Sequence, residues 1–397
     1  MGAAVRRERG GATRPAPVNV GIYNQPSGTG LGGASYTIAV LAGALARRHR
    51  VEIVHHAAPA GGLTVPRLEA FSGVGLDGVR LRYVDRTRTR LRPAELSRGY
   101  DLFIALAYGW PPPGHARVNV LRVLFPLRDR DGGPRWRRGV RRIEDALDRV
   151  RWRASPRTYQ VVVANSDYTR EWTPSMLGPV LRSALLAPGA AGGAEREAAP
   201  HPERGPIQPG KKQAEMLAAY RALAADGARG WRYASGGSAE RSGRGVRYLR
   251  VIRALAEGLD VDVRPDVDRP TLRRLRGEAS IFWHAAGFGE DLERDPNRAE
   301  HFGIVTVEAM AAGCVPVVFD AGGGPREIVE HERTGFRWRT LEELCRYTRL
   351  LMTDERVRSR LAAAGQARAR TFGRDAFLAG FAGRLAPLLP ELGSLAP

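Results

Sequence analysis

A strand, a glycine-rich turn, a helix and a second strand follow one another near the start of the chain, and this order constrains the fold more than any other feature. The first strand is the apolar run at 18–24 (VNVGIYN), and the turn GTGLGG runs from Gly28 to Gly33. An apolar helical pattern covers 36–48, and the next strand is 51–55. This order is the opening unit of a doubly wound parallel sheet. The sequence therefore predicts an α/β fold whose strands run parallel.

The chain is long enough for two such units, because its 397 residues exceed the size at which a single core usually stops growing. Further strand candidates lie at 79–84, 102–107, 118–125 and 160–164. With them we expect an N-terminal Rossmann-like domain over 18–185. The alternation of helices and strands resumes over 211–374, where we expect a second Rossmann-like domain. The predicted architecture therefore has two doubly wound parallel-sheet domains.

The remaining segments are expected to connect or close these two domains. Residues 186–210 are rich in Pro, Gly, Ala and Glu and show no apolar period, which is typical of a linker or a degenerate insertion. Residues 375–397 contain an amphipathic stretch that predicts a closing helix. Residues 1–17 are basic and rich in Gly, Ala and Pro, and they lack the apolar stretch of a secretory signal, so we expect a disordered tail.

The sequence indicates neither a membrane span nor an oxidising compartment. No apolar run approaches the ~20 residues that span a bilayer. The two cysteines, Cys314 and Cys345, lie in different predicted elements and offer neither a disulfide framework nor a metal cluster. We therefore expect a cytoplasmic protein.

The formal net charge of +20 raises the question of a negatively charged partner. Nearly all of that charge is arginine spread along both halves, and the chain has only two lysines, Lys211 and Lys212. We favour a solvated arginine-rich surface, with a peripheral contact to the anionic inner face of a membrane as the alternative. The sequence contains no helix-turn-helix, zinc-finger or aromatic RNA-binding motif, so no specific nucleic-acid partner is expected.

The segment EHFGIVTVEAMAAGCVP, at 300–316, carries the strongest indication of function. An apolar, Ala-rich helix is predicted over 304–312, Gly313 is a suitable left-handed cap, and a strand follows at once. The start of such a helix presents unpaired N–H groups and the positive end of its dipole, which together favour a diphosphate. Glu300 precedes the helix and Glu308 lies one turn inside it, so both carboxylates can accept hydrogen bonds from hydroxyl groups of a ligand.

This segment resembles the signature of the family-four retaining glycosyltransferases (glycosyl transferases group 1), which carry two glutamates eight positions apart. Here those glutamates are Glu300 and Glu308. The resemblance implies the GT-B fold, in which two Rossmann-like domains face an interdomain cleft. The resemblance implies that Glu300 acts in catalysis at the donor sugar and that Glu308 binds the ribose. It also implies a donor-binding role for the residues that follow Glu300, namely His301, Phe302, Gly303, Ile304 and Val305.

The resemblance extends over most of residues 18–385 and is weakest in the middle. The segments 281–291 (IFWHAAGFGED), 321–330 (AGGGPREIVE) and 334–336 (TGF) are similar to those of bacterial members. Together with EHFGIVTVE, part of the first segment also resembles the dolichol-pathway mannosyltransferase branch. This likeness implies a bacterial enzyme that uses a nucleotide-diphosphate sugar, with GDP-mannose as the favoured donor.

The loop from Gly28 to Gly33 also satisfies G-x-G-x-x-G, the pattern of dinucleotide-binding domains. Ribose recognition in those domains needs a carboxylate at the end of the second strand, but histidines stand there and Glu52 lies at its start. The family resemblance instead implies that Gly32 and Gly33 let the backbone approach the donor phosphate. We favour this role over binding of NAD.

The segment GPIQPGK at 205–211 nearly matches a phosphate-binding P-loop, but Lys212 follows where the pattern requires Ser or Thr. Pro206 and Pro209 also remove N–H donors, so an ATPase is rejected. The run KKQAEMLAAYRAL instead resembles the family's lysine-led helix. This resemblance implies that Lys212 neutralises the donor diphosphate as it leaves.

Two positions depart from the family pattern. The Gly-Arg-Phe-like turn that supplies a second phosphate cation has no counterpart in 187–210, and Leu124 stands where relatives often have a histidine before a proline. His115 is nearby but is interpreted as a surface residue. The sequence therefore predicts a retaining hexosyltransferase without a metal or other cofactor, acting on a glycan, lipid-linked or small-molecule hydroxyl. A non-catalytic or weakly active protein that binds a nucleotide sugar or a glycan is the alternative.

Overall fold

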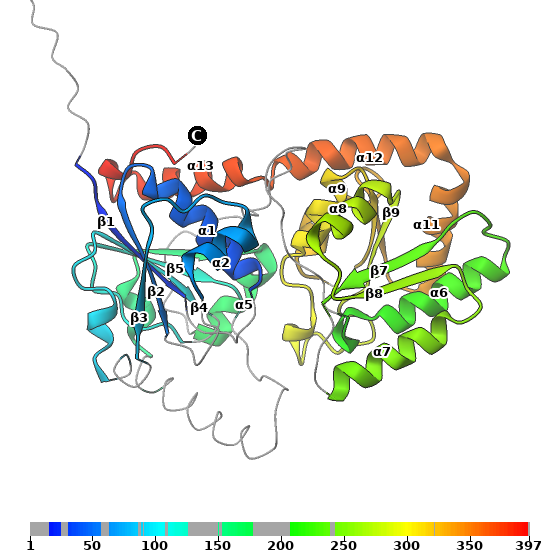
Figure 1. Cartoon of the computed structure of the whole chain (residues 1–397), viewed down its shortest axis with the longest axis horizontal. Helices are drawn as coiled ribbons and strands as arrows, with labels where there is room; N and C mark the ends of the chain where they lie inside the picture. The colour runs from blue at the N-terminus through cyan, green and yellow to red at the C-terminus, as the bar shows by residue number, and fades with distance from the viewer. Residues whose placement is uncertain are drawn as a thin grey trace, which may run out of the picture.

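The computed structural model describes residues 16–24, 31–56, 63–85, 89, 91–107, 110–125, 150, 153–177, 207–238, 243–320 and 322–395. Most of the expected tail at 1–17 and of the expected linker at 186–210 lies outside these residues, and so does the stretch 28–30 of the glycine-rich loop. The described elements form two α/β halves that lie side by side in Figure 1.

The N-terminal half contains a six-stranded sheet in the order β3-β2-β1-β4-β5-β6, in which every adjacent pair is parallel. Its strands are β1 (Asn19–Asn24), β2 (Arg50–His56), β3 (Arg80–Val84), β4 (Leu102–Ala107), β5 (Val118–Val123) and β6 (Val161–Ala164). Alternate residues of β4 join two different hydrophobic clusters, because this central strand is covered on both faces. The strand order reverses at β1, which gives the doubly wound topology that the opening segment predicts.

Helices from both ends of the chain pack on this sheet. Helices α1 (Gly33–Ala46), α2 (Val65–Ser72) and α5 (Asp167–Leu177) follow β1, β2 and β6. The helix expected within 375–397 is present as α13 (Arg374–Leu385). It returns to the N-terminal half and buries aromatic and leucine side chains in the same core as β1 and α1 (Figure 1).

The described residues of the C-terminal half form two separate parallel sheets. β10 (Val315–Phe319) lies between β9 (Ile281–His284) and β11 (Phe336–Trp338), whereas β7 (Tyr233–Gly237) pairs with β8 (Val261–Pro265). The helices of this half are α6 (Gln213–Ala225), α7 (Gly243–Ala256), α8 (Arg269–Glu278), α9 (Ile304–Ala311), α10 (Gly324–Ile328), α11 (Leu341–Thr353) and α12 (Glu355–Arg370).

The helix predicted over 304–312 is confirmed as α9, and it ends as the sequence predicts. Gly313 has φ +93°, and the Cys314 N–H donates to the Ala309 carbonyl at 2.9 Å. The chain then enters β10 directly. Because a helix between parallel strands runs opposite to them, the start of α9 lies at the carboxyl ends of β9 and β10.

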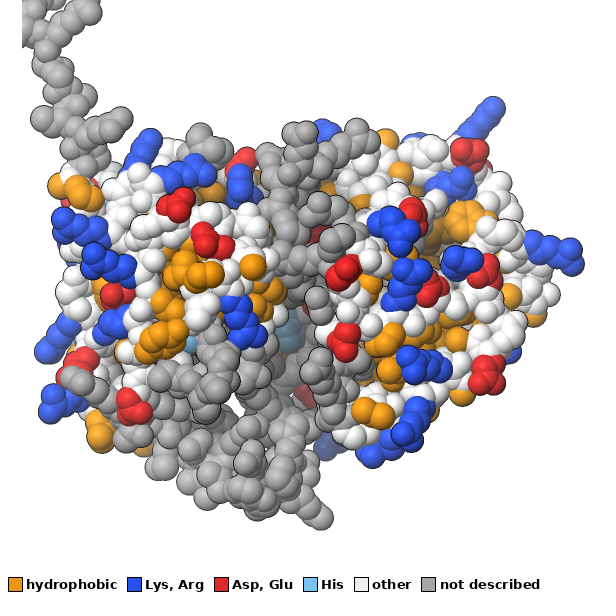
Figure 2. Space-filling model, viewed as in Figure 1, with side chains coloured by type: hydrophobic (Ala, Val, Ile, Leu, Met, Phe, Trp, Pro, Cys, Tyr) orange, Lys and Arg blue, Asp and Glu red, His pale blue; other side chains and the backbone are white. Residues whose placement is uncertain are grey.

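Charged side chains are distributed over both halves of the face shown in Figure 2, with acidic groups among the arginines. This distribution fits the solvated surface expected from the sequence. Among the described residues, no helix is both long enough and apolar enough to cross a membrane.

Candidate active site

The chain enters α9 through a glycine in the left-handed region. Gly303 has φ +92°, and a Cβ there would meet Glu300, Pro325 and Thr306 at 3.4 Å. The first N–H groups of an α-helix have no partner within the helix, and both Gly303 and Val305 line a cavity. The positive end of α9 therefore faces open space.

The cavity has a volume of about 720 Å³ and extends between β7 and β9, the facing edges of the two sheets. Aromatic walls are provided by Tyr233 and Trp283, whose ring centroids lie 5.6 Å apart. Polar groups are provided by Lys211, His284 and Glu300, which also line the cavity. An apolar hollow with a few convergent polar groups beside a helix start is a typical ligand site.

Glu300 is the centre of this polar group. The Lys211 ammonium donates a hydrogen bond to Oε2 of Glu300, and Nε2 of His284 lies 3.3 Å from the same oxygen. Burial by itself would raise the pKa of Glu300, but the charge of Lys211 and the hydrogen bond with His284 hold that pKa well below its usual range. Glu300 is therefore ionised throughout the physiological pH range.

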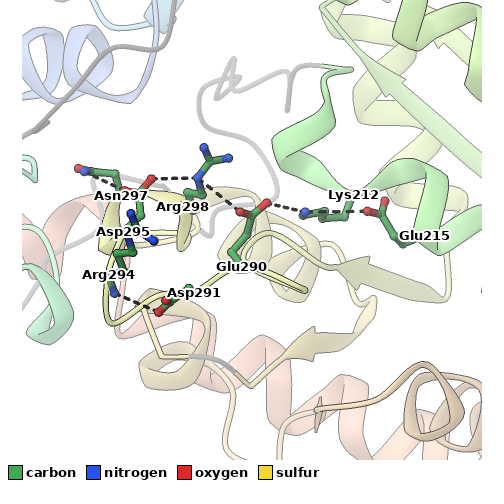
Figure 3. Close-up of polar contacts among 8 residues, drawn as sticks. All are labelled: Lys212, Glu215, Glu290, Asp291, Arg294, Asp295, Asn297 and Arg298. Carbon is green, nitrogen blue, oxygen red and sulfur yellow. Dashed lines mark hydrogen bonds and ion pairs between the residues drawn. The ribbon is translucent and has the colours of Figure 1, made fainter.

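The two lysines of the chain point to different partners. Lys212 places its Nζ 2.6 Å from Oε1 of Glu290 and 3.9 Å from Glu215, as Figure 3 shows. Arg298 approaches the other oxygen of Glu290 at 3.4 Å. Lys212 also occupies the left-handed region, with φ +60°, at the position that caps α6. Lys211, and not the sequence-assigned Lys212, is the lysine that lines the cavity.

Glu308 lies in the wall beside the cavity. Its Oε2 is 2.8 Å from Nη2 of Arg276, and its side chain is 10% exposed. Arg276 itself lines the cavity from α8. The structure thus brings Glu308, Arg276 and the start of α9 to one side of the same hollow.

His301 contacts the N-terminal half. Its ring stacks on that of Phe125, with centroids 3.9 Å apart and planes 5° apart. The neighbouring Tyr168 donates its hydroxyl hydrogen to the Pro296 carbonyl at 3.0 Å, and its backbone N–H donates to Glu327 at 3.0 Å. These contacts tie the loop that carries Glu300 to β5 and α5.

The other predicted donor-binding residues have varied positions. Phe302 is buried against Phe372, and Ile304 packs against the same hydrophobic cluster. The side chains of Phe302 and Ile304 therefore anchor the loop in the core. Gly32 precedes α1 in extended backbone, and a Cβ there would meet no atom of the described residues within 4 Å. Gly33 is the first residue of α1.

Sequence reasoning missed Lys211, His284, Arg276 and the Phe125–Tyr168 pair. A signal was present for His284, because it is a polar residue at the carboxyl end of an apolar strand, where α/β folds place ligands. The sequence alone could not show which of Lys211 and Lys212 lines the cavity, because this depends on the backbone conformation at the start of α6. The partners of Glu308 and His301 come from distant segments, and sequence pattern does not reveal them.

Comparison with solved structures identifies the fold as GT-B, with two Rossmann-like domains. HepE of Anabaena in complex with UDP aligns over 93% of this chain and 100% of its own, with a TM-score of 0.64 and 16% identity. Sucrose-phosphate synthase from Thermosynechococcus elongatus aligns over 94% and 99%, with a TM-score of 0.62 and 14% identity. The predicted fold class is confirmed.

Sequence similarity to known families is concentrated in the C-terminal half. Residues 253–368, which include the site around α9, match the family described as Glycosyl transferases group 1. GDP-Man:Man(3)GlcNAc(2)-PP-Dol alpha-1,2-mannosyltransferase of Dictyostelium discoideum is 36% identical over 87 residues, which are 22% of this chain and 15% of that protein. D-inositol 3-phosphate glycosyltransferase of Xylanimonas cellulosilytica is 35% identical over 129 residues, which are 32% of this chain and 29% of that protein. The matched regions thus span less than a third of either relative.

Proposed function

We propose that this protein is a retaining glycosyltransferase that transfers a sugar from a nucleotide-diphosphate donor to a hydroxyl group. The observation that carries the proposal is the cluster of Lys211, His284 and Glu300 at the start of α9, beside a cavity of about 720 Å³. A cation and a helix start attract a diphosphate, and a half-buried carboxylate such as that of Glu300 accepts hydrogen bonds from sugar hydroxyls. The match of residues 253–368 to the Glycosyl transferases group 1 family supports the same conclusion.

In the proposed reaction the bond between the sugar C1 and the diphosphate oxygen breaks, and the acceptor oxygen bonds to C1 on the same face. The acceptor proton passes to the departing diphosphate, which is the base that the reaction itself creates. Lys211 and the first N–H groups of α9 stabilise the charge that grows on the leaving group. Glu300 orients the sugar through its hydroxyls, and the proposal requires no metal ion or other cofactor.

Two of the compared proteins indicate candidate donor nucleotides. The Dictyostelium relative carries GDP-Man in its name, and the HepE structure contains UDP. We place GDP-mannose first because the predicted likeness to the mannosyltransferase branch agrees with that relative. The acceptor is proposed to be a glycan, a lipid-linked glycan or a small molecule, which the enzyme meets in the cytoplasm or at the anionic inner face of the membrane.

The direct test is a panel of UDP-, GDP-, ADP- and dTDP-sugars, in which thermal stabilisation and release of the nucleoside diphosphate are measured together. We expect one donor to raise the melting temperature and to be hydrolysed slowly, because binding to the native state alone stabilises it. Glu308→Ala is expected to abolish the stabilisation by that donor while the ligand-free protein remains folded.

Two other outcomes of the panel would contradict the proposal. Stabilisation without release of the diphosphate, also in the presence of simple sugar acceptors, would indicate a protein that only binds nucleotide sugars. No response to any donor would exclude nucleotide-sugar chemistry at this cavity.

A further inference from the structure

The ion pair between Arg276 and Glu308 is buried in the cavity wall. The distance from Nη2 to Oε2 is 2.8 Å, and the two side chains are 18% and 10% exposed. Arg276 comes from α8 and Glu308 from α9, so the pair joins two helices beside the nucleotide end of the proposed donor site. Val305 and Ala309, which flank Glu308 on its helix, line the cavity together with Arg276.

Stability alone is a poor explanation for this pair. Burial removes both charges from water, and an apolar pair of similar volume often stabilises a fold equally well. Arg274, on the same helix, shows the ordinary arrangement, because it approaches Glu278 at 3.9 Å with both side chains more than 60% exposed. The side chains of Arg276 and Glu308 are far less exposed than those of this pair.

The chemistry of the pair suits the binding of a diol. A carboxylate has two oxygens with several acceptor positions, so it can accept from a guanidinium and from hydroxyl groups at the same time. The planar guanidinium limits the orientations that the carboxylate can adopt. Burial raises the pKa of the adjacent Cys314 to about 11, which shows how strongly this environment disfavours an unpaired negative charge.

We propose that Arg276 is a positioning residue that holds Glu308 oriented toward the two hydroxyls of the donor ribose, so that the site selects ribonucleotides over 2′-deoxyribonucleotides. This inference rests on the proposed function, because it concerns the ribose end of the same donor. It adds the role of Arg276, which the two glutamates alone do not imply.

The test measures the affinity of the full-length protein for UDP and GDP and for their 2′-deoxy counterparts by calorimetry. The wild type is expected to bind the ribonucleotide at least about tenfold more tightly, because a hydroxyl that is absent leaves a buried acceptor unsatisfied. Arg276→Met is expected to weaken ribonucleotide binding. The ratio of the dissociation constants for the 2′-deoxyribonucleotide and the ribonucleotide should then be close to one. Arg276→Lys should restore part of the difference in affinity between ribonucleotide and 2′-deoxyribonucleotide. The control Arg346→Met, at an exposed arginine of α11 that pairs with Glu343 and is not among the cavity-lining residues, should leave that difference unchanged.

Arg276→Met could misfold, because it leaves the Glu308 carboxylate without its cation. A double variant that also neutralises Glu308 controls for this effect. Glu308→Gln and Glu308→Gln with Arg276→Met are compared, and we expect the second substitution to cause no further loss of ribonucleotide affinity. The inference would be overturned if Arg276→Met left the affinity ratio of ribonucleotide to 2′-deoxyribonucleotide unchanged, whether or not both affinities fell equally. The proposed function would not be affected by that result. A wild-type protein that binds none of these four nucleotides and none of the UDP-, GDP-, ADP- and dTDP-sugars would overturn both.

Discussion

The rings of Phe125 and His301 lie parallel, 3.9 Å apart, and join the N-terminal half of the chain to the loop that begins α9. His301 directly follows Glu300, so the position of the proposed catalytic carboxylate depends on a residue at the end of β5. Phe125 is fully buried and has φ +103°, a backbone conformation that is costly for an aromatic residue. The surrounding packing must therefore hold it there.

His301→Phe tests whether this ring acts by stacking or by contacting the donor. Because a phenyl ring can stack on Phe125 in the same way, we expect the variant to fold and to keep kcat within about threefold. His301→Ala removes the stack and should destabilise the protein by about 1–3 kcal/mol in denaturant unfolding. A large rise of KM for the donor in His301→Phe alone would instead show that the imidazole binds the donor.

The stability of the protein should fall when the pH is lowered from about 6.5 toward 4. Burial of His301 lowers its pKa from 6.5 to about 4, so the unfolded chain takes up a proton in this range and the native state does not. The contribution is present above pH 6.5 and is lost as the pH falls, with a total of about 3 kcal/mol. Urea unfolding across this range checks the slope.

His301→Phe is the matched control for that pH dependence. A phenyl ring does not titrate, so the slope of the free energy of unfolding between pH 6.5 and 4 should become shallower. Glu300 adds to this slope below about pH 5.5, because its native pKa is held well below the value near 4.5 that it has in the unfolded chain. The change of slope between the wild type and His301→Phe therefore isolates the part that His301 contributes. An unchanged slope in the variant would show that other groups cause the acid sensitivity.

The adjacent lysines should differ in their effect on catalysis. Lys211→Met removes the cation that contacts Glu300 in the cavity, and we expect kcat to fall by about 100-fold or more. Lys212→Gly removes the ion pair with Glu290 but relieves a left-handed conformation, so we expect less than about a fivefold change in kcat. Initial rates with saturating donor separate the two variants, and the reverse order would support the sequence-based assignment to Lys212.

Chelation of divalent metals should leave the rate unchanged. In the proposed mechanism Lys211 and the N–H groups at the start of α9 compensate the charge of the diphosphate. We therefore expect the initial rate in excess EDTA to stay within about twofold of the untreated rate. Loss of activity that added Mg²⁺ or Mn²⁺ restores would show that a metal ion takes part.

The sequence by itself determined the parallel α/β fold and the position of the main motif. The strand, turn and helix order at 18–55 and the helix that ends at Gly313 depend on contacts between near neighbours, and such contacts leave a periodic pattern in the sequence. The same local logic placed Glu300 ahead of α9 and Glu308 within it.

Tertiary structure alone decided the partners of those residues. Lys211 faces Glu300 while Lys212 faces Glu290, because the left-handed turn at Lys212 sends consecutive side chains in different directions. Arg276 reaches Glu308 from another helix, and Phe125 reaches His301 across 176 positions of sequence. Such pairings depend on how separate elements pack against each other. The spacing of residues along the chain does not predict that packing.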